Sequence, residues 1–312
     1  MTDSPQAAIV AQGLTKSFPG VQAVDGLSFE ARAGEIFGLV GPDGAGKTTT
    51  LRMLAGIMPP DAGAASVAGC DVVREPESAK HALSYMPQRF GLYEDLTVDE
   101  NIRFYADLFG VRKGERGSRS TELLQAAGMS EFRKRMAGKL SGGMKQKLGL
   151  VCALIHRPKV ILLDEPTTGV DPVSRRDFWR ILYELIAEGV AILTSTAYLD
   201  EAERCHRVAL MHKGRLLFSD TPASLKGKLG KDVLSVTSAD PRSLRTELEH
   251  AEGISSLVLT GDAVHVVVDN AARRIPEFKA QLSRAHVSFD AMQQVVPIIE
   301  DLFVDAVTRG AA

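Results

Sequence analysis

The stretch that most constrains the fold of this chain is GPDGAGKTT, at residues 41–49. It fits the pattern G-x-x-x-x-G-K-[ST], and it lies between the apolar run EIFGLV and the helical pattern TTTLRMLAGI. In such a loop the glycines let successive backbone N–H groups point at phosphate oxygens, and the start of the helix adds roughly half a positive charge. The sequence therefore predicts a phosphate-binding loop between a buried strand and a helix.

Each residue of this loop is a candidate for nucleotide binding. The candidates are Gly41, Pro42, Asp43, Gly44, Ala45, Gly46, Lys47, Thr48 and Thr49. Lys47 is expected to reach the β- and γ-phosphates, and the hydroxyl of Thr48 is expected to bind Mg²⁺. The motif indicates nucleotide binding but does not decide the reaction.

A second motif, KVILLDEP at residues 159–166, is an apolar strand that ends in two acids. A carboxylate at the end of a strand beside a phosphate-binding loop is the expected Mg²⁺ ligand, and Asp164 takes that role. Glu165 is then expected to orient the water that attacks the γ-phosphate. The alternative is that DEP, which precedes TTGVDP, only starts a turn.

The order of elements predicts an α/β fold for residues 1–230. EIFGLV, LSYMP, KVILLDEP and VAILTS read as buried strands, and each leads towards polar or helical sequence. Repeated strand-then-helix order predicts a largely parallel sheet that is covered on both faces. Residues 97–140 have a helical pattern that opens with Thr97 and Glu100 in capping-box spacing. The basic stretch RKGERGSRS, at residues 112–120, could face lipid headgroups, but we expect a solvated loop.

Residues 231–312 follow a different order. Strand, helix, two strands around a GD turn, helix and strand succeed one another, which is the ferredoxin-like α+β pattern. The last segment, PIIEDLFVDAV, predicts a helix with one apolar face. That face carries Ile298, Leu302 and Ala306, with Ile299 and Phe303 beside it.

Composition limits the classes of partner. The net charge is −2, so no basic excess points to nucleic acid. Cys70, Cys152 and Cys205 are far apart in sequence and form no zinc or disulfide pattern, which suits a reducing cytosol. We expect no signal peptide in MTDSPQAAIVAQ. The longest apolar runs are far short of the about 20 residues that cross a bilayer, so any membrane role is expected to come through a partner.

LSGGM, at residues 140–144, precedes an amphipathic helix. Ser141 is expected to cap that helix. The paired Gly142 and Gly143 also expose backbone amides at a helix start, which makes a second anion site. One nucleotide cannot comfortably use two such sites of one subunit unless they face each other. Two copies of the chain, arranged head to tail, would satisfy this.

The set and order of these motifs resemble the ATPase subunits of ATP-binding cassette (ABC) transporters. The resemblance covers residues 7 to about 225. It rests on the phosphate-binding loop at 41, Gln88 in SYMPQRFGLYEDLT, LSGGM at 140, ILLDEP at 161 and GVDP at 169. The wording YMPQRFGLYEDLTVDEN and the later EDLF resemble the branch that serves ABC-2-type two-component exporters, including drug-efflux systems.

The resemblance implies further roles. Phe18 would stack on adenine, and Gln88 would contact Mg²⁺ or its water and report the nucleotide state to a membrane subunit. Ser141 and Gly143 would complete the γ-phosphate site of the opposite protomer. Asp171 would lie at the seam of the dimer.

The implied protein is a P-loop ATPase of residues 1–230, with a helical subdomain at about 90–157 and an accessory domain at 231–312. It would bind ATP and Mg²⁺ and form a homodimer or an asymmetric pair with a second ABC ATPase. It would drive ABC-2-type permease subunits from the cytoplasmic face of the membrane, and it would bind no nucleic acid. The alternatives are a soluble cassette ATPase that acts in translation or DNA repair, and a switch in which ATP binding rather than turnover matters.

One position departs from the family pattern. Where the family carries a histidine that contacts the γ-phosphate and holds Glu165 and the water in line, the resemblance places Ala197, in LTSTAYLDEAE. Alanine cannot donate a hydrogen bond, and Thr196, Ser195 and Tyr198 are the candidate substitutes. A missing donor costs about 10²- to 10³-fold in rate, so we expect slower rather than absent hydrolysis.

Two histidines lie near this position in the chain. His206 is expected within the helix that follows, and His212 in a turn after VALM. Both are too far along the chain to replace the missing side chain, and both are expected at the surface.

Overall fold

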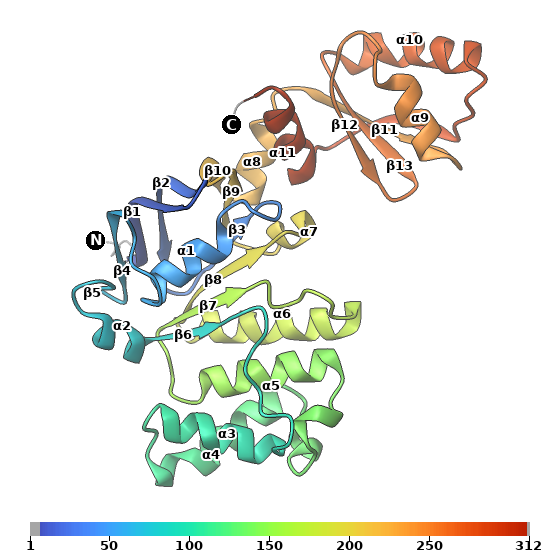
Figure 1. Cartoon of the computed structure of the whole chain (residues 1–312). Coiled ribbons are helices and arrows are strands. Elements are labelled where there is room, and N and C mark those ends of the chain that lie inside the picture. Colours follow the sequence, from blue (N-terminus) through green and yellow to red (C-terminus); the bar gives the residue numbers. More distant parts are fainter. Residues whose placement is uncertain (1–6, 311–312) are drawn as a thin grey trace, which may run out of the picture. The chain divides into compact units, whose positions relative to one another are not determined.

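The structure is a computed structural model that describes residues 7–310. The first six residues of the predicted ATPase domain and the last two of the C-terminal domain lie outside the described residues. The chain divides into two compact units (Figure 1). The first comprises residues up to Tyr198 together with Cys205–Leu216, and the second comprises Leu199–Arg204 and the residues from Leu217 onwards. The predicted boundary at residue 230 stays a prediction.

A six-stranded sheet forms the centre of the first unit, and one of its edge strands begins in that unit and continues into residues of the second. Its strands, in spatial order, are β10 (Arg215–Asp220), β9 (Arg207–His212), β3 (Ile36–Val40), β8 (Ala191–Thr196), β7 (Val160–Asp164) and β6 (Leu83–Met86). The pairs that join β9 to β3, β3 to β8, β8 to β7 and β7 to β6 are all parallel. Every residue of β3, β7 and β8 is buried, as continuous apolar runs require. The predicted parallel sheet is confirmed.

A second, antiparallel sheet was not expected from the sequence. Its strands are β2 (Val21–Arg32), β1 (Ala7–Phe18), β4 (Ala62–Val67) and β5 (Cys70–Asp71). Helix α1 (Lys47–Leu54) packs against strands of both sheets. The ring of Phe29 in β2 stacks on Phe37 in β3 with centroids 5.2 Å apart. One hydrophobic core therefore joins the two sheets and α1.

The remaining helices of the first unit follow β5 and precede β8. They are α2 (Pro76–Ala82), α3 (Val98–Leu108), α4 (Lys113–Ala126), the short 3-10 turns η1 (Ser130–Phe132) and η2 (Ala137–Lys139), α5 (Gly142–Leu154) and α6 (Pro172–Ala187). The expected capping box is present at the start of α3, because Glu100 N donates to Thr97 Oγ1 at 3.3 Å and Thr97 N donates to Glu100 Oε2 at 2.8 Å. Figure 1 shows α3, α4 and α5 together in green.

The expected loop at residues 112–120 is wrong, because α4 begins at Lys113 and runs through this stretch. Glycine costs a helix about 1 kcal/mol relative to alanine, and the stretch contains two. Contacts with neighbouring segments offset that cost. Arg116 pairs with Asp107 and donates from Nε to Val111 O at 2.7 Å. Arg133 Nη2 donates to Thr121 Oγ1 at 2.8 Å.

Helix α5 lies very close to the segment that follows β6. A β-carbon added to Gly149 would lie 3.1 Å from Met86 Cε and 3.2 Å from Phe90 Cγ. The ring of Phe90 also packs against Tyr105 of α3, with centroids 5.0 Å apart. The segment after β6 is therefore held between two helices, and a methyl group at position 149 would require Met86 and Phe90 to shift by a few tenths of an ångström.

From β11 onwards, the second unit has the predicted order of strands and helices. Its elements are α7 (Leu199–Ala202), α8 (Pro222–Gly227), β11 (Asp232–Thr237), α9 (Pro241–Leu248), β12 (Ile254–Thr260), β13 (Ala263–Val268), α10 (Ala271–Arg284), β14 (Ala291–Val295) and α11 (Ile299–Thr308). The antiparallel sheet has the order β12-β13-β11-β14. Side chains such as Leu234, Val266 and Phe278 form a core between the sheet and helices α9 and α10.

The predicted last helix is α11, but it begins at Ile299, so Ile298, which was predicted on its apolar face, is the N-cap and is only half-buried. Ile299, Leu302 and Ala306 are each less than 7% exposed. Helix α11 packs against β12 of its own unit. Across residues 7–310, no helix combines the length and the apolar character needed to span a membrane.

Candidate functional site

The predicted phosphate-binding loop connects the end of β3 at Val40 to the start of α1 at Lys47. Gly46 has φ 99°, and a β-carbon there would overlap the carbonyl oxygen of Ala23. Only glycine therefore fits at this position. Lys47 Nζ donates to Gly41 O at 2.8 Å and to Pro42 O at 3.1 Å, so its side chain curls back over the loop.

Asp164, at the end of β7, is buried among three hydroxyl groups. Thr48 Oγ1 donates to Asp164 Oδ1 at 3.0 Å, and Ser195 Oγ donates to the same oxygen at 2.7 Å. Tyr85 OH donates to Asp164 Oδ2 at 3.2 Å. Burial, followed by the negative charge of Asp164, raises the pKa of Tyr85 to about 12. The phenol therefore keeps its proton throughout the physiological pH range and is a hydrogen-bond donor to this carboxylate.

Glu165 has a left-handed backbone conformation, with φ 48°. For a residue with a long side chain this conformation costs on the order of 1–3 kcal/mol and persists only where the surroundings hold it. Glu165 N donates to Ser195 O at 3.2 Å and to Ser195 Oγ at 3.0 Å. Glu165 O also accepts from Thr168 N at 3.2 Å, so the turn that the sequence offered as an alternative is present as well.

The carboxylate of Glu165 joins the phosphate-binding loop to Gln88. Lys47 Nζ lies 3.2 Å from Glu165 Oε1, and Gln88 Nε2 donates to Glu165 Oε2 at 3.2 Å. Lys47 and Glu165 have side chains only 4% and 14% exposed, so water screens this pair weakly. The structure thus brings Lys47, Thr48, Gln88, Asp164 and Glu165 into one cluster of contacts.

The oxygens in this cluster suit Mg²⁺. Hydroxyl, carboxylate and amide oxygens are ligands that Mg²⁺ accepts, and proteins commonly bind it with one or two carboxylates plus substrate phosphates. Thr48 Oγ1 and Asp164 Oδ1 are 3.0 Å apart. Among the described residues, no group of three or more His, Cys, Asp and Glu side chains could hold a metal. A Mg²⁺ ion here would complete its coordination with phosphate and water oxygens.

Ser141 is the N-cap of α5, as expected, and its Oγ accepts from Met144 N at 3.3 Å. Ser141 and Gly142 are exposed, whereas Gly143 is buried. A β-carbon on Gly143 would overlap the side chain of Ser174 in the first turn of α6. Asp171 caps α6, where Oδ1 accepts from Ser174 N at 2.9 Å. LSGGM and GVDP therefore meet within one chain.

Phe18 and Asp171 lie outside the cluster around Lys47. Phe18 is the last residue of β1, and its side chain is 41% exposed. Hydrogen bonds from the backbone N–H groups of Val173 and Ser174 hold the pKa of Asp171 below its usual range, with those from Ser174 contributing most. The proposed roles of both residues depend on a nucleotide or a second protomer and stay predictions.

Ala197 directly follows β8 and is exposed. Thr196 O accepts from Gly41 N at 3.2 Å, so the end of β8 is bonded to the start of the phosphate-binding loop. Thr196 Oγ1 accepts from Tyr198 N at 2.9 Å, and the ring of Tyr198 lies 4.9 Å from the guanidinium carbon of Arg175. Residue 197 therefore emerges beside the loop, as the resemblance implies.

The structure corrects the positions of the two histidines. His206 was expected in a helix, but it precedes β9, where its Nδ1 accepts from Ile36 N at 3.2 Å at the start of β3. His212 was expected in a turn, but it is the last residue of β9. Residues Arg207–Leu210, between the two histidines, pair with β3 and are therefore extended. His206 is exposed, as expected, whereas His212 is half-buried.

Two hydroxyl groups of the site were missed or assigned differently from the sequence. Tyr85 was not considered, and Ser195 was considered only as a substitute for the missing histidine. Both bind Asp164 instead. The signal available in the sequence was a polar residue inside an apolar strand, in LSYM and in VAILTS.

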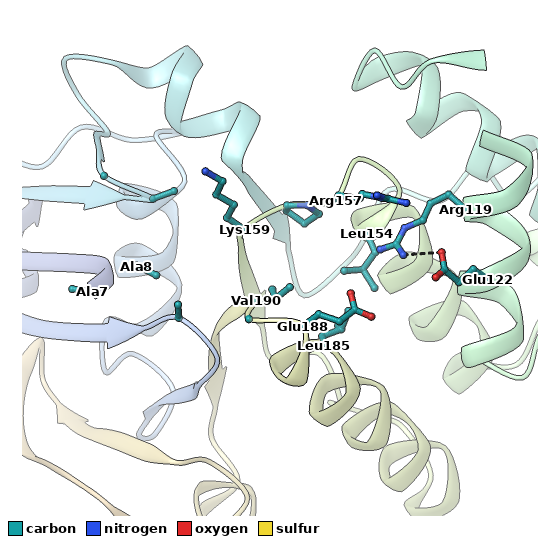
Figure 2. Close-up of a pocket in the computed structure, with 15 residues that line it drawn as sticks. Ala7, Ala8, Arg119, Glu122, Leu154, Arg157, Lys159, Leu185, Glu188 and Val190 are labelled. Atoms are coloured by element: carbon teal, nitrogen blue, oxygen red, sulfur yellow. Dashed lines mark hydrogen bonds and ion pairs between the residues drawn. The ribbon is translucent and has the colours of Figure 1, made fainter. Parts of the chain in front are cut away.

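A cavity of about 580 Å³ lies elsewhere in the first unit (Figure 2). Its lining includes the residues that precede β7 and β8, whereas the phosphate-binding loop and Asp164 lie where strands end. Arg119, Arg157 and Lys159 contribute positive charge, but Glu122 and Glu188 contribute negative charge, and Arg119 pairs with Glu122 at 3.0 Å. None of the predicted site residues lines this cavity.

Comparison with known proteins agrees with the geometry of the cluster. Residues 24–168 match the family model described as ABC transporter. The chain is 43% identical over 303 residues to the probable multidrug ABC transporter ATP-binding protein YbhF of Escherichia coli (strain K12), which covers 96% of this chain. The chain spans about half the length of that relative, namely 52%.

Two further matches extend over nearly whole proteins. The daunorubicin/doxorubicin resistance ATP-binding protein DrrA of Streptomyces peucetius is 36% identical, with 97% of this chain and 93% of that protein covered. A solved ATP-binding subunit of an ABC transporter is 31% identical with a TM-score of 0.65, and the match covers 72% of this chain and 93% of that one. The chain therefore belongs to the family of ABC transporter ATP-binding proteins.

Proposed function

We propose that this chain binds MgATP, hydrolyses it, and powers a separately encoded membrane permease in export. The observation that supports hydrolysis most directly is the contact of Glu165 with Lys47 and Gln88, next to the carboxylate of Asp164. A lysine for the phosphates, an oxygen pair for Mg²⁺ and a carboxylate for water are the parts that phosphoryl transfer requires.

The proposed nucleotide site uses the residues named from the sequence. Phe18 stacks on adenine, residues 41–49 surround the phosphates, and Lys47 contacts the β- and γ-phosphates. Thr48, Asp164 and Gln88 hold Mg²⁺, which when bound neutralises charge on the phosphate oxygens. Glu165 accepts a hydrogen bond from the attacking water and orients it.

The second half of each proposed site comes from another protomer. Ser141, Gly142 and Gly143 lie at the start of α5, where backbone N–H groups favour an anion. Ser141 and Gly142 are exposed and hence accessible to a partner. We place Asp171 at the seam of this dimer, which is either a homodimer or an asymmetric pair with a second ABC ATPase.

The proposed partner is a pair of ABC-2-type permease subunits. The relatives named above are a probable multidrug ABC transporter ATP-binding protein and a daunorubicin/doxorubicin resistance protein, which favours export. The chain would then work at the cytoplasmic face of the membrane, held there by its permease and without nucleic acid. The nucleotide site lies within residues 1–230, with a helical subdomain at about 90–157, and residues 231–312 are an accessory domain.

Glu165→Gln tests this function. The amide keeps the size of the side chain but cannot accept a proton, so ATP binding should remain, turnover should fall by at least about 10²-fold, and MgATP should trap a dimer. The assays are steady-state phosphate release and gel filtration with MgATP. Glu188→Gln, which changes an exposed glutamate away from the cluster, is the matched control.

Two results would contradict the proposal. Full turnover by Glu165→Gln would contradict the role assigned to Glu165 at the attacking water, and absence of turnover in the wild-type chain would favour an ATP-binding switch. Co-purification of the chain with a membrane protein separates the exporter from a cassette ATPase that acts without a permease.

A further inference from the structure

Strand β8 connects the two segments that handle phosphate. It lies between β3, which leads into the phosphate-binding loop, and β7, which ends at Asp164. Thr196 O accepts from Gly41 N at 3.2 Å, and one residue earlier Ser195 O accepts from Glu165 N at 3.2 Å. The end of β8 therefore sets the spacing between the loop and the Asp164–Glu165 pair.

The side chain of Ser195 adds a second connection at the same place. Its Oγ donates to Asp164 Oδ1 at 2.7 Å and accepts from Glu165 N at 3.0 Å. A carboxylate can only accept and a backbone N–H can only donate, so the direction of both hydrogen bonds is determined. Ser195 is 0% exposed, and thus water does not compete for either bond.

We propose that Ser195 is a positioning residue for ATP hydrolysis, one that holds the Mg²⁺ ligand Asp164 and the water-orienting Glu165 in a single arrangement. This inference rests on the function proposed above. Its hydroxyl donates to the same Asp164 oxygen as Thr48, which aims that oxygen towards the Thr48 side chain. Its acceptor holds the N–H of a residue in a left-handed conformation, where the surroundings must supply the restraint.

Because alanine replaces the family's histidine at position 197, Ser195 is more important for holding Glu165 in place. Ala197 has no polar side-chain group, and Thr196 Oγ1 accepts from Tyr198 N in the loop that follows. Of the candidate hydroxyls at residues 195–198, that of Ser195 contacts both the carboxylate of Asp164 and the backbone N–H of Glu165. The restraint on Glu165 from this strand therefore comes from Ser195.

Strand β8 also offers a matched control. Thr194 is buried next to Ser195, and its Oγ1 has no hydrogen-bond partner among the described residues. Thr194→Val removes a buried hydroxyl from the same strand without breaking a hydrogen bond. Ser195→Ala removes the hydroxyl that joins the two acids, and Ser195→Thr retains it.

The experiment compares the full-length wild type and these three variants. The measurements are kcat, ATP affinity, the Mg²⁺ concentration that gives half-maximal ATP binding, and Tm. For Ser195→Ala we expect a fall in kcat of about 10- to 100-fold, the usual effect of removing a residue that orients a metal ligand. ATP affinity at saturating Mg²⁺ and Tm should stay close to the Thr194→Val values, and the Mg²⁺ midpoint should rise. Ser195→Thr should recover most of the kcat.

The outcomes separate this inference from the proposed function. Turnover by the wild type with equal kcat in Ser195→Ala and Thr194→Val would overturn the inference alone. If Tm and ATP affinity of Ser195→Ala fall together with its kcat, the hydroxyl of Ser195 has a structural role only. If the wild type has no turnover, the proposed hydrolysis fails, and an unchanged Mg²⁺ midpoint in Ser195→Ala would then overturn the inference independently.

Discussion

Replacing Ala197 with histidine should increase the rate of ATP hydrolysis. Residue 197 follows Thr196, whose carbonyl is bonded to Gly41 at the start of the phosphate-binding loop, and the preceding Ser195 is bonded to Glu165. Ala197 is exposed, so an imidazole has room at this position. Its N–H would then extend from the end of β8 beside the phosphate-binding loop and Glu165, the two groups proposed to surround the γ-phosphate.

The size of the effect has an upper bound. One preorganised donor to a transition-state oxygen contributes about 10²- to 10³-fold in rate, which corresponds to about 3–4 kcal/mol. The hydrogen bond from Tyr198 N to Thr196 Oγ1 restricts the loop, so the new side chain will not reach ideal geometry. We expect a gain of about tenfold or more within that bound. The gain should fall on kcat, because charge reaches the phosphate oxygens mainly in the transition state.

Steady-state ATPase assays at saturating MgATP test this expectation. The samples are the wild type, Ala197→His and Ala197→Leu, each alone and with the native membrane partner. Leucine fills similar space without a donor, so only histidine should raise kcat. Equal kcat for all three chains would mean that another group already supplies the contact. If the wild type is slow alone but fast in a mixed complex, the natural pair is asymmetric.

Two further changes test other parts of the molecule. Gly117→Ala should stabilise the first unit by about 0.5–1 kcal/mol, because Gly117 is exposed within α4 and an added β-carbon meets nothing within 4 Å; an unchanged or lower Tm would argue against a helix at residues 112–120. Burial, and then the carboxylate of Asp301, raises the pKa of Glu300 in the folded chain above its value in the unfolded chain. The folded state therefore binds the proton of the Glu300 carboxyl more tightly, and the free energy of unfolding decreases as the pH rises through the folded-state pKa. Glu300→Gln should therefore resist urea better than the wild type at pH 7, with a difference that shrinks as pH falls; a difference independent of pH would contradict this reasoning.

The parts of the fold that could be predicted are those in which consecutive residues share one property, such as being apolar. Strands β3, β7 and β8 are buried at every position, so each is a continuous apolar run that the sequence displays directly. Strands β1 and β2 of the antiparallel sheet are only partly buried and contain glycines, and their pattern is weak. The helical character of residues 113–120 depends on partners that lie outside the segment, such as Asp107, which pairs with Arg116, and Arg133, which donates to Ser120. Local propensity alone could not indicate it.

The site divides in a similar way. Lys47, Thr48, Asp164 and Glu165 were predicted because their chemistry requires particular residues at a particular spacing. Tyr85 and Ser195 each contribute a single hydroxyl, and they reach Asp164 only because parallel pairing brings β6 and β8 to either side of β7. Their contacts with Asp164 depend on which strands are neighbours, and that order is not visible in any one stretch of sequence.

The close packing at Gly149 has a mechanical consequence. Helix α5 rises about 1.5 Å per residue, so the eight residues from Ser141 to Gly149 span about 12 Å. A tilt of about 5° about position 149 would therefore displace Ser141 by about 1 Å, which is enough to make or break a hydrogen bond. Phe90 touches this pivot and lies two residues after Gln88, the residue that contacts Glu165. If α5 tilted about this contact, a small movement of the segment that follows Gln88 would be accompanied by a larger one at Ser141, the N-terminal end of the helix.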